Sequence, residues 1–185
     1  MDSSRYAPII VAVILYSSMF SWAAKDLRQS STDFIIKSCS STLYPEICKK
    51  TLLPYAGHVP MTAKFLVNVA LEQSSSSSES AIGAMKELIQ KKQIADQWLQ
   101  ASKDCVGLLA DSKYNLQRSI ARLQNYNKGD LKLLISDIRT WVSAALTDDN
   151  TCTDGFSDVT LSGNLKIVVE QKILYNTKLV SIALA

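Results

Sequence analysis

Four cysteines behind an apolar leader constrain this chain more than any other feature. Residues Ile9 to Tyr16 carry no charge, Arg5 precedes them, and the small residues Ser21 and Ala23 follow. This order predicts a secretory signal peptide over residues 1–23. A membrane anchor is the alternative, but the apolar run is shorter than the ~20 residues that a span needs. In an exported chain, an even number of cysteines indicates disulfides rather than metal ligands or redox thiols.

The cysteines are Cys39, Cys48, Cys105 and Cys152, and the sequence alone permits three pairings among them. The mature chain from Ala24 onward fits one domain and is long enough to bury a core, so disulfides would supplement that core. A formal net charge of +3 is too small an excess to indicate a nucleic-acid partner. No second long apolar run is present, and we expect no membrane span.

Apolar residues recur at spacings of three and four, which predicts helices rather than strands. One stripe, on a helix expected to begin near Asp96, contains Leu109, Ser112, Leu116, Ile120 and Leu123. A second follows Asp130, a candidate N-cap, and contains Leu131, Leu134, Ile138, Trp141 and Ala145. After a polar stretch from Thr147 to Gly163, the last contains Leu165, Val169, Ile173, Asn176 and Val180.

The N-terminal part predicts a helical hairpin. One short helix ends near Cys39, and a second opens at Thr42 with Pro45 in its first turn. Downstream, the five serines from Ser74 to Ser78 have the composition of a flexible linker. Because apolar residues on both sides continue one face, we favour a single long helix through the serines.

These patterns predict an all-α fold: an up-down-up-down four-helix bundle over residues 61–185, behind an extension and hairpin over residues 24–60. We expect no enzymatic activity, no cofactor and no metal. The only histidine, His58, has no nucleophile motif around it, and no zinc or phosphate-loop spacing occurs. Trp98 and Trp141 lie at helical spacing with core residues, which favours burial over a sugar-binding platform.

Three segments resemble one known family. The segment from Trp141 to Phe156 (WVSAALTDDNTCTDGF) is similar to the signature of the plant invertase and pectin methylesterase inhibitor family. The segment from Thr42 to Cys48 (TLYPEIC) resembles its first-hairpin motif, and Ala101 to Cys105 (ASKDC) resembles its third-cysteine motif. The likeness covers one inhibitor domain of about residues 33–185.

The resemblance implies a four-helix bundle with an N-terminal hairpin and the pairs Cys39–Cys48 and Cys105–Cys152. It implies a secreted protein of the cell wall that blocks the substrate cleft of pectin methylesterase in a 1:1 complex. The family also contains inhibitors of cell-wall or vacuolar invertase. The invertase branch has Pro-Lys-Phe after a Gly-Asp, whereas Leu131, Lys132 and Leu133 stand there in this chain. We therefore favour the pectin methylesterase branch.

For that branch, the resemblance implies an acidic strip on the helix after the third cysteine, at positions 107, 111 and 114. Only Asp111 is acidic in this chain, and Asn115 lies one helical turn further on. Thr151 and Asp154 match the family around the fourth cysteine. The candidate enzyme-binding residues are thus Asp111, Asn115, Thr151 and Asp154.

Two alternatives remain open from the sequence. Lys132 would be the contact if the target is invertase. The chain could also be a secreted helical protein without an enzyme target.

Overall fold

The structure is a computed structural model that describes residues 26–58, 60–127, 129–157 and 163–185. No strand occurs in these ranges. The expected signal peptide over residues 1–23 lies outside them.

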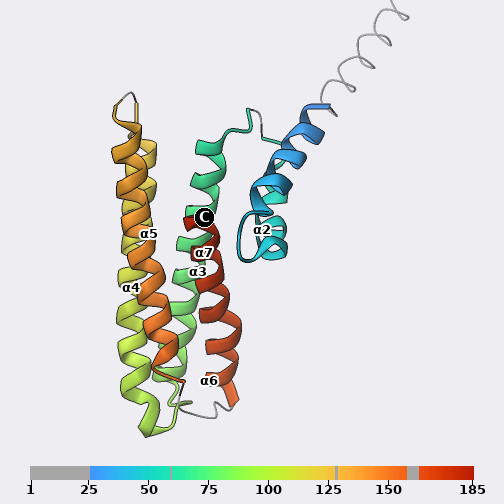
Figure 1. Ribbon diagram of the computed structural model, residues 1–185. Helices are drawn as coiled ribbons and strands as arrows, with labels where there is room; N and C mark the ends of the chain where they lie inside the picture. Colours follow the sequence, from blue (N-terminus) through green and yellow to red (C-terminus); the bar gives the residue numbers. More distant parts are fainter. Residues whose placement is uncertain (1–25, 59, 128, 158–162) are drawn as a thin grey trace, which may run out of the picture.

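Four helical segments make the bundle. They are α3 (Ala63–Gln90), α4 (Asp96–Gln124), α5 (Leu131–Asp154), and a last helix formed by α6 (Gly163–Val168), η3 (Val169–Ile173) and α7 (Leu174–Leu184). Helices α3 and α5 each pack against both α4 and α7, so the four segments close a ring around one core (Figure 1). This confirms the four-helix bundle expected from the apolar stripes.

The helix starts follow from local side-chain chemistry. The Asp130 carboxylate accepts hydrogen bonds from the N–H groups of Lys132 at 2.8 Å and Leu133 at 3.2 Å, which confirms Asp130 as an N-cap. The Thr62 hydroxyl accepts from the N–H of Phe65 at 3.1 Å and caps α3. Each cap satisfies donors that the first helical turn leaves without an internal partner.

The core is built in layers to which each helix contributes. One apolar layer contains Leu71, Leu116, Val142 and Val180, and each is fully buried. Another cluster, towards the other end of the bundle, includes Met85, Leu109 and Ile173. Such burial of aliphatic side chains is the main favourable term in folding.

A polar layer lies within this apolar core. Ser78 of α3, Ser112 of α4, Asp149 of α5 and Asn176 of α7 are all fully buried. The Ser78 hydroxyl shares its one proton between the Ser74 carbonyl oxygen at 3.1 Å and Asn176 Oδ1 at 3.2 Å, and Asn176 Nδ2 donates to Asp149 Oδ2 at 2.8 Å. Asp149 Oδ1 and Ser112 Oγ have no hydrogen-bond partner among the described residues. The layer therefore leaves one oxygen of a buried carboxyl unsatisfied, which is costly for its charged form.

The serine run is helical, as favoured from the sequence, and belongs to the middle of α3. Ser74 and Ser78 are fully buried, and their hydroxyls donate to the backbone carbonyls of Ala70 and Ser74. These intrahelical bonds satisfy the buried hydroxyls, so a serine-rich turn is compatible with a packed helix.

The N-terminal hairpin consists of a helix over residues 26–39, then α2 (Pro45–Leu52) and the 3₁₀ turn η2 (Leu53–Tyr55). Figure 1 shows it on the side of α3 and α7. Ile35 and Leu52 of the hairpin pack with Leu66 of α3 and Leu179 of α7. The hairpin thus extends the core at one end of the bundle.

Two disulfides join the pairs that the family resemblance implies. Cys39 and Cys48, with Cα atoms 5.5 Å apart, link the two helices of the hairpin. Cys105 and Cys152, with Cα atoms 4.5 Å apart, link α4 to α5. The second bridge joins two cysteines that are 47 positions apart on consecutive helices, and it fixes these helices side by side.

Three features differ from the sequence-based expectation. Helix α5 continues through the polar stretch to Asp154, because Asp149 and Cys152 prolong its buried face. Leu131 and Trp141 do not belong to that face, since Leu131 is 54% exposed and Val142 is buried in place of Trp141. The last helix contains the π-helical segment η3, which no sequence pattern indicated.

Candidate functional site

The outer seam between α4 and α5 carries two of the four candidate enzyme-binding residues. Asp111 and Asn115 lie on α4, and both face Asp148 of α5. Asn115 Nδ2 donates to Asp148 Oδ2 at 3.5 Å, a long contact. Asp111 is close enough to raise the pKa of Asp148 by charge repulsion. Two carboxyls and an amide therefore form one cluster across the seam.

The pKa of Asp148 is raised above its ordinary value. Partial burial is the main cause, and the negative charge of Asp111 adds to it, while the hydrogen bond from Asn115 opposes both. Asp111 itself is exposed and makes no ion pair with any described residue. An exposed carboxylate next to a second carboxyl is poorly compensated within this chain, so a cation from outside would be attracted to it.

A cation–aromatic stack lies next along the seam. The guanidinium carbon of Arg118 is 4.2 Å from the ring centroid of Trp141 and 5.7 Å from that of Tyr114. Tyr114 is 59% exposed. Large aromatic rings and arginine are the side chains most often found at the centres of protein–protein interfaces. This arrangement gives the seam a pre-organised contact surface.

An ion pair between α4 and α5 lies at the end of the seam beyond Arg118. Arg122 Nε and Asp137 Oδ2 are 2.9 Å apart, and about a third of each side chain is exposed. We call the whole set the α4/α5 strip: Asp111, Tyr114, Asn115, Arg118 and Arg122 of α4, with Asp137, Trp141 and Asp148 of α5. The strip covers about 16 Å along α4 at the ordinary helical rise.

Thr151 and Asp154 lie at the end of α5, beyond the strip. The Thr151 hydroxyl is exposed and donates to the Thr147 carbonyl. The carboxylate of Asp154 is exposed and makes no hydrogen bond to a described residue. A negative charge in the last turn of a helix opposes the helix dipole. Asp154 therefore does not stabilise α5 through the helix dipole. Thr151 lies one helical turn from Asp148 on the same helix.

Lys132 is at the opposite end of α5. It is exposed in the first turn, between the exposed side chains of Leu131 and Leu133. Sixteen positions along the helix separate it from Asp148, which is about 24 Å. Lys132, the expected contact for invertase, therefore lies far from the cluster formed by Asp111, Asn115 and Asp148.

His58, Trp98 and Trp141 each pack against neighbouring side chains of the bundle. The imidazole of His58 stacks on the ring of Phe65, with centroids 3.7 Å apart. Trp98 is half-buried against the core cluster of Met85, Leu109 and Ile173. Trp141 is half-buried under Arg118 rather than in the core as expected. In the part of the chain that the structure describes, no group of three or more potential metal ligands occurs. No helix there is long and apolar enough to cross a membrane.

Asp148, Asp149 and Arg118 were not singled out from the sequence. Asp148 and Asp149 are adjacent, and a step of 100° per residue directs one to the outer seam and the other to the core. Their position in the same motif could have signalled this split, because Cys152 fixes which side of the helix is buried. Arg118 gave no signal, since its role depends on Trp141 of another helix.

Fold and strip together define the class of protein: a helical bundle clamped by two disulfides, with a polar face along α4 and α5. Residues 33–185 match the family model described as plant invertase/pectin methylesterase inhibitor. Because that match covers most of the chain, this protein belongs to the plant invertase/pectin methylesterase inhibitor family, a family of enzyme inhibitors.

Curated relatives support the same assignment. Pectinesterase inhibitor 10 of Arabidopsis thaliana is 38% identical over 85% of this chain, which spans only 51% of that relative's length. The 21 kDa protein of Daucus carota is 31% identical, with 94% of this chain and 92% of the relative covered. Pectinesterase inhibitor 9 of Arabidopsis thaliana is also 31% identical, with 95% and 89% covered.

Solved structures share the fold. A crystal structure of a mutant form of a pectin methylesterase inhibitor from Arabidopsis superposes with a TM-score of 0.65, at 20% identity, over 79% of this chain and 89% of the other. A second inhibitor structure from Arabidopsis thaliana gives a TM-score of 0.57 at 19% identity, over 82% and 92%. At these identities the likeness concerns the arrangement of the helices.

Proposed function

We propose that this protein is a secreted inhibitor of pectin methylesterase that acts in the cell wall. In this proposal, residues 1–23 direct export, and the mature chain forms a 1:1 complex that covers the enzyme's substrate cleft. Relatives named as pectinesterase inhibitors support the target. The observation that carries the proposal is the α4/α5 strip, where Asp111 lies uncompensated beside Asp148 and Arg118 is stacked on aromatic rings.

The strip is suited to inhibition by occlusion because it is rigid. Its side chains project from two long helices that Cys105–Cys152 joins at one end. Pre-organised side chains lose little conformational entropy on binding, so more of the contact energy appears as affinity. A complex of ordinary specificity would bury about 1,200–2,000 Å², which requires surface beyond the strip. Thr151 and Asp154 would extend the contact at the end of α5.

The direct test measures the activity of purified pectin methylesterase and acid invertase with increasing amounts of the mature chain. We expect inhibition of pectin methylesterase alone, and a complex mass equal to one copy of each protein by light scattering. Inhibition of invertase alone would move the target to the other branch. Inhibition of neither enzyme at micromolar protein would favour a secreted helical protein without an enzyme target.

Replacing Asp111 by alanine should weaken inhibition of pectin methylesterase by roughly tenfold, because a carboxylate near the centre of the contact loses its partner on the enzyme. The inhibition constant is measured at fixed ionic strength. Asp33→Ala is the matched control, since Asp33 is exposed on the N-terminal hairpin. Equal inhibition by Asp111→Ala and the parent protein, both folded, would remove Asp111 from the contact.

Lys132 supports a second candidate, inhibition of invertase. It is flanked by exposed Leu131 and Leu133, and Ile135 one turn on is 48% exposed, so this end of α5 offers a cation within an apolar patch. The Lys132→Ala variant should leave inhibition of pectin methylesterase unchanged. It would reduce inhibition of invertase only if this end of α5 binds that enzyme.

A further inference from the structure

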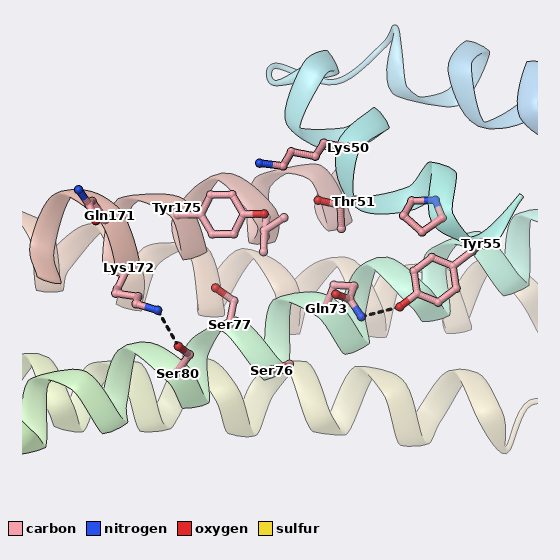
Figure 2. Close-up of a pocket in the computed structure, with 12 residues that line it drawn as sticks. Lys50, Thr51, Tyr55, Gln73, Ser76, Ser77, Ser80, Gln171, Lys172 and Tyr175 are labelled. Carbon is pink, nitrogen blue, oxygen red and sulfur yellow. Dashed lines mark hydrogen bonds between the residues drawn. The ribbon is translucent and has the colours of Figure 1, made fainter. Parts of the chain in front are cut away.

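A cavity of about 600 Å³ lies between the hairpin, α3 and the last helix (Figure 2). The cavity has three walls. Lys50 and Thr51 of α2 line the first, Ser77 and Ser80 of α3 line the second, and Lys172 of η3 lines the third. Its volume is within the usual range for small-molecule sites. It lies on the α3 and α7 side of the ring, whereas the α4/α5 strip lies on the opposite side.

Two sequence features make this hollow. The serine run and Ser80 just after it place short side chains where leucine would fill the space, so Ser76, Ser77 and Ser80 line the cavity instead of closing it. Across from them, the π-helical turn η3 changes the phase of the last helix and presents Gln171 and Lys172 to the cavity. Single π-helical turns within α-helices occur frequently at functional sites.

The charged side chains that line the cavity are all positive. Lys50 and Lys172 are its only charged side chains, and neither makes an ion pair with a described residue. Lys172 Nζ instead contacts the Ser80 hydroxyl at 3.3 Å. Two cations without a carboxylate between them favour an anionic ligand.

The rest of the lining is rich in hydroxyl and amide groups. Gln73 Nε2 donates to the Tyr55 hydroxyl at 2.9 Å, which orients both side chains at one end of the cavity (Figure 2). The Thr51 hydroxyl oxygen is buried and has no partner among the described residues. Tyr175, which is 37% exposed, offers a ring edge and a hydroxyl on the wall formed by the last helix.

We propose that this cavity binds a carboxylated sugar chain, that is, a uronate oligosaccharide. The two lysines would pair with carboxylates, and the serine and glutamine groups would bond sugar hydroxyls. Lysine can also pair with phosphate, but the many hydroxyl and amide groups of the lining favour a ligand that carries hydroxyl groups as well as negative charge. Because the cavity and the strip lie on opposite sides of the bundle, this site is independent of the enzyme contact proposed above.

The test measures binding of an oligogalacturonate to the mature chain by calorimetry at low and at physiological salt. The fully methyl-esterified form of the same oligosaccharide, a neutral glucose oligosaccharide and inorganic phosphate are the comparison probes. We expect the acidic oligosaccharide to bind and the neutral probes to bind at least about tenfold more weakly, because they lack charge-assisted hydrogen bonds. Equal binding of the methyl ester, or displacement by equimolar phosphate, would overturn the proposal.

Two sets of variants locate the site. Lys50→Gln with Lys172→Gln should weaken binding roughly tenfold or more. Lys37→Gln with Lys103→Gln makes the same change of charge at exposed lysines outside the cavity and should leave binding unchanged. Ser77→Tyr should abolish binding by filling the hollow without changing charge, with the helical circular dichroism retained. Equal losses in the control pair, or full binding by Ser77→Tyr, would overturn the assignment.

Discussion

Replacing Asp149 by asparagine is expected to abolish most of the loss of stability that this protein undergoes as the pH rises from 4 to 8. Asp149 is fully buried, and burial raises its pKa from 3.8 to about 7; the negative charge of Asp148 adds to the rise, and the hydrogen bond from the Asn176 amide partly opposes it. In the unfolded chain this carboxyl titrates at its ordinary value. The folded state therefore holds a proton that the unfolded state has released.

The sign of the pH dependence follows from that difference. Where the folded state binds more protons, stability falls as pH rises. The contribution of Asp149 is fully present below about pH 4 and is lost as pH rises through 7. A difference of this size corresponds to about 4 kcal/mol between the two ends of the range. Asp148 also has a raised pKa, so it acts in the same direction.

The measurement is the free energy of unfolding by denaturant at several pH values. Asp149→Asn keeps the shape and an acceptor for Asn176, so we expect its stability to match the parent protein within about 1 kcal/mol at pH 4 and to exceed it by several kcal/mol at pH 8. Asp33→Asn, on the exposed hairpin, should leave the pH dependence unchanged. A parallel loss of stability in the parent protein and in Asp149→Asn would show that Asp149 is ionised in the folded state throughout.

Removing the Cys105–Cys152 disulfide by two serine substitutions is expected to cost about 4 kcal/mol of stability. The bridge closes a loop of 47 residues between α4 and α5, and a longer loop restricts the unfolded chain more. Cys39–Cys48 closes a loop of only 9 residues, for which the same relation gives about 2.5 kcal/mol. Both bridges are buried, so the substitutions also place hydroxyls in the core.

Unfolding of both double variants by denaturant tests the difference between the bridges. The Cys105/Cys152 variant should be the less stable of the two, and it should also inhibit pectin methylesterase more weakly if the α4/α5 strip is the contact. The Cys39/Cys48 variant should retain a stable α4 and α5. If it proved the less stable of the two, the hairpin would contribute more to the bundle than loop closure alone predicts.

The fold was largely accessible from the sequence because it depends on local periodicity. The stripes through Leu109 and Leu116, and through Leu165 and Ile173, predict which faces are buried, and those residues are buried. The candidate site was accessible only in part. Asp111 and Asn115 could be named from the motif, but their neighbour Asp148 and the stack of Arg118 on Trp141 depend on how two helices pack.

The sequence by itself determined the helices, their caps and the cysteines available for bridging, since each depends on residues within a few turns of one another. Only the tertiary structure decided that Ser78, Ser112, Asp149 and Asn176 meet in one buried layer and that a cationic hollow opens beside the serine run. Those groupings join residues from three or four helices. The physical reason is that a buried charge or a cavity is created by what surrounds it, and local spacing does not encode those surroundings.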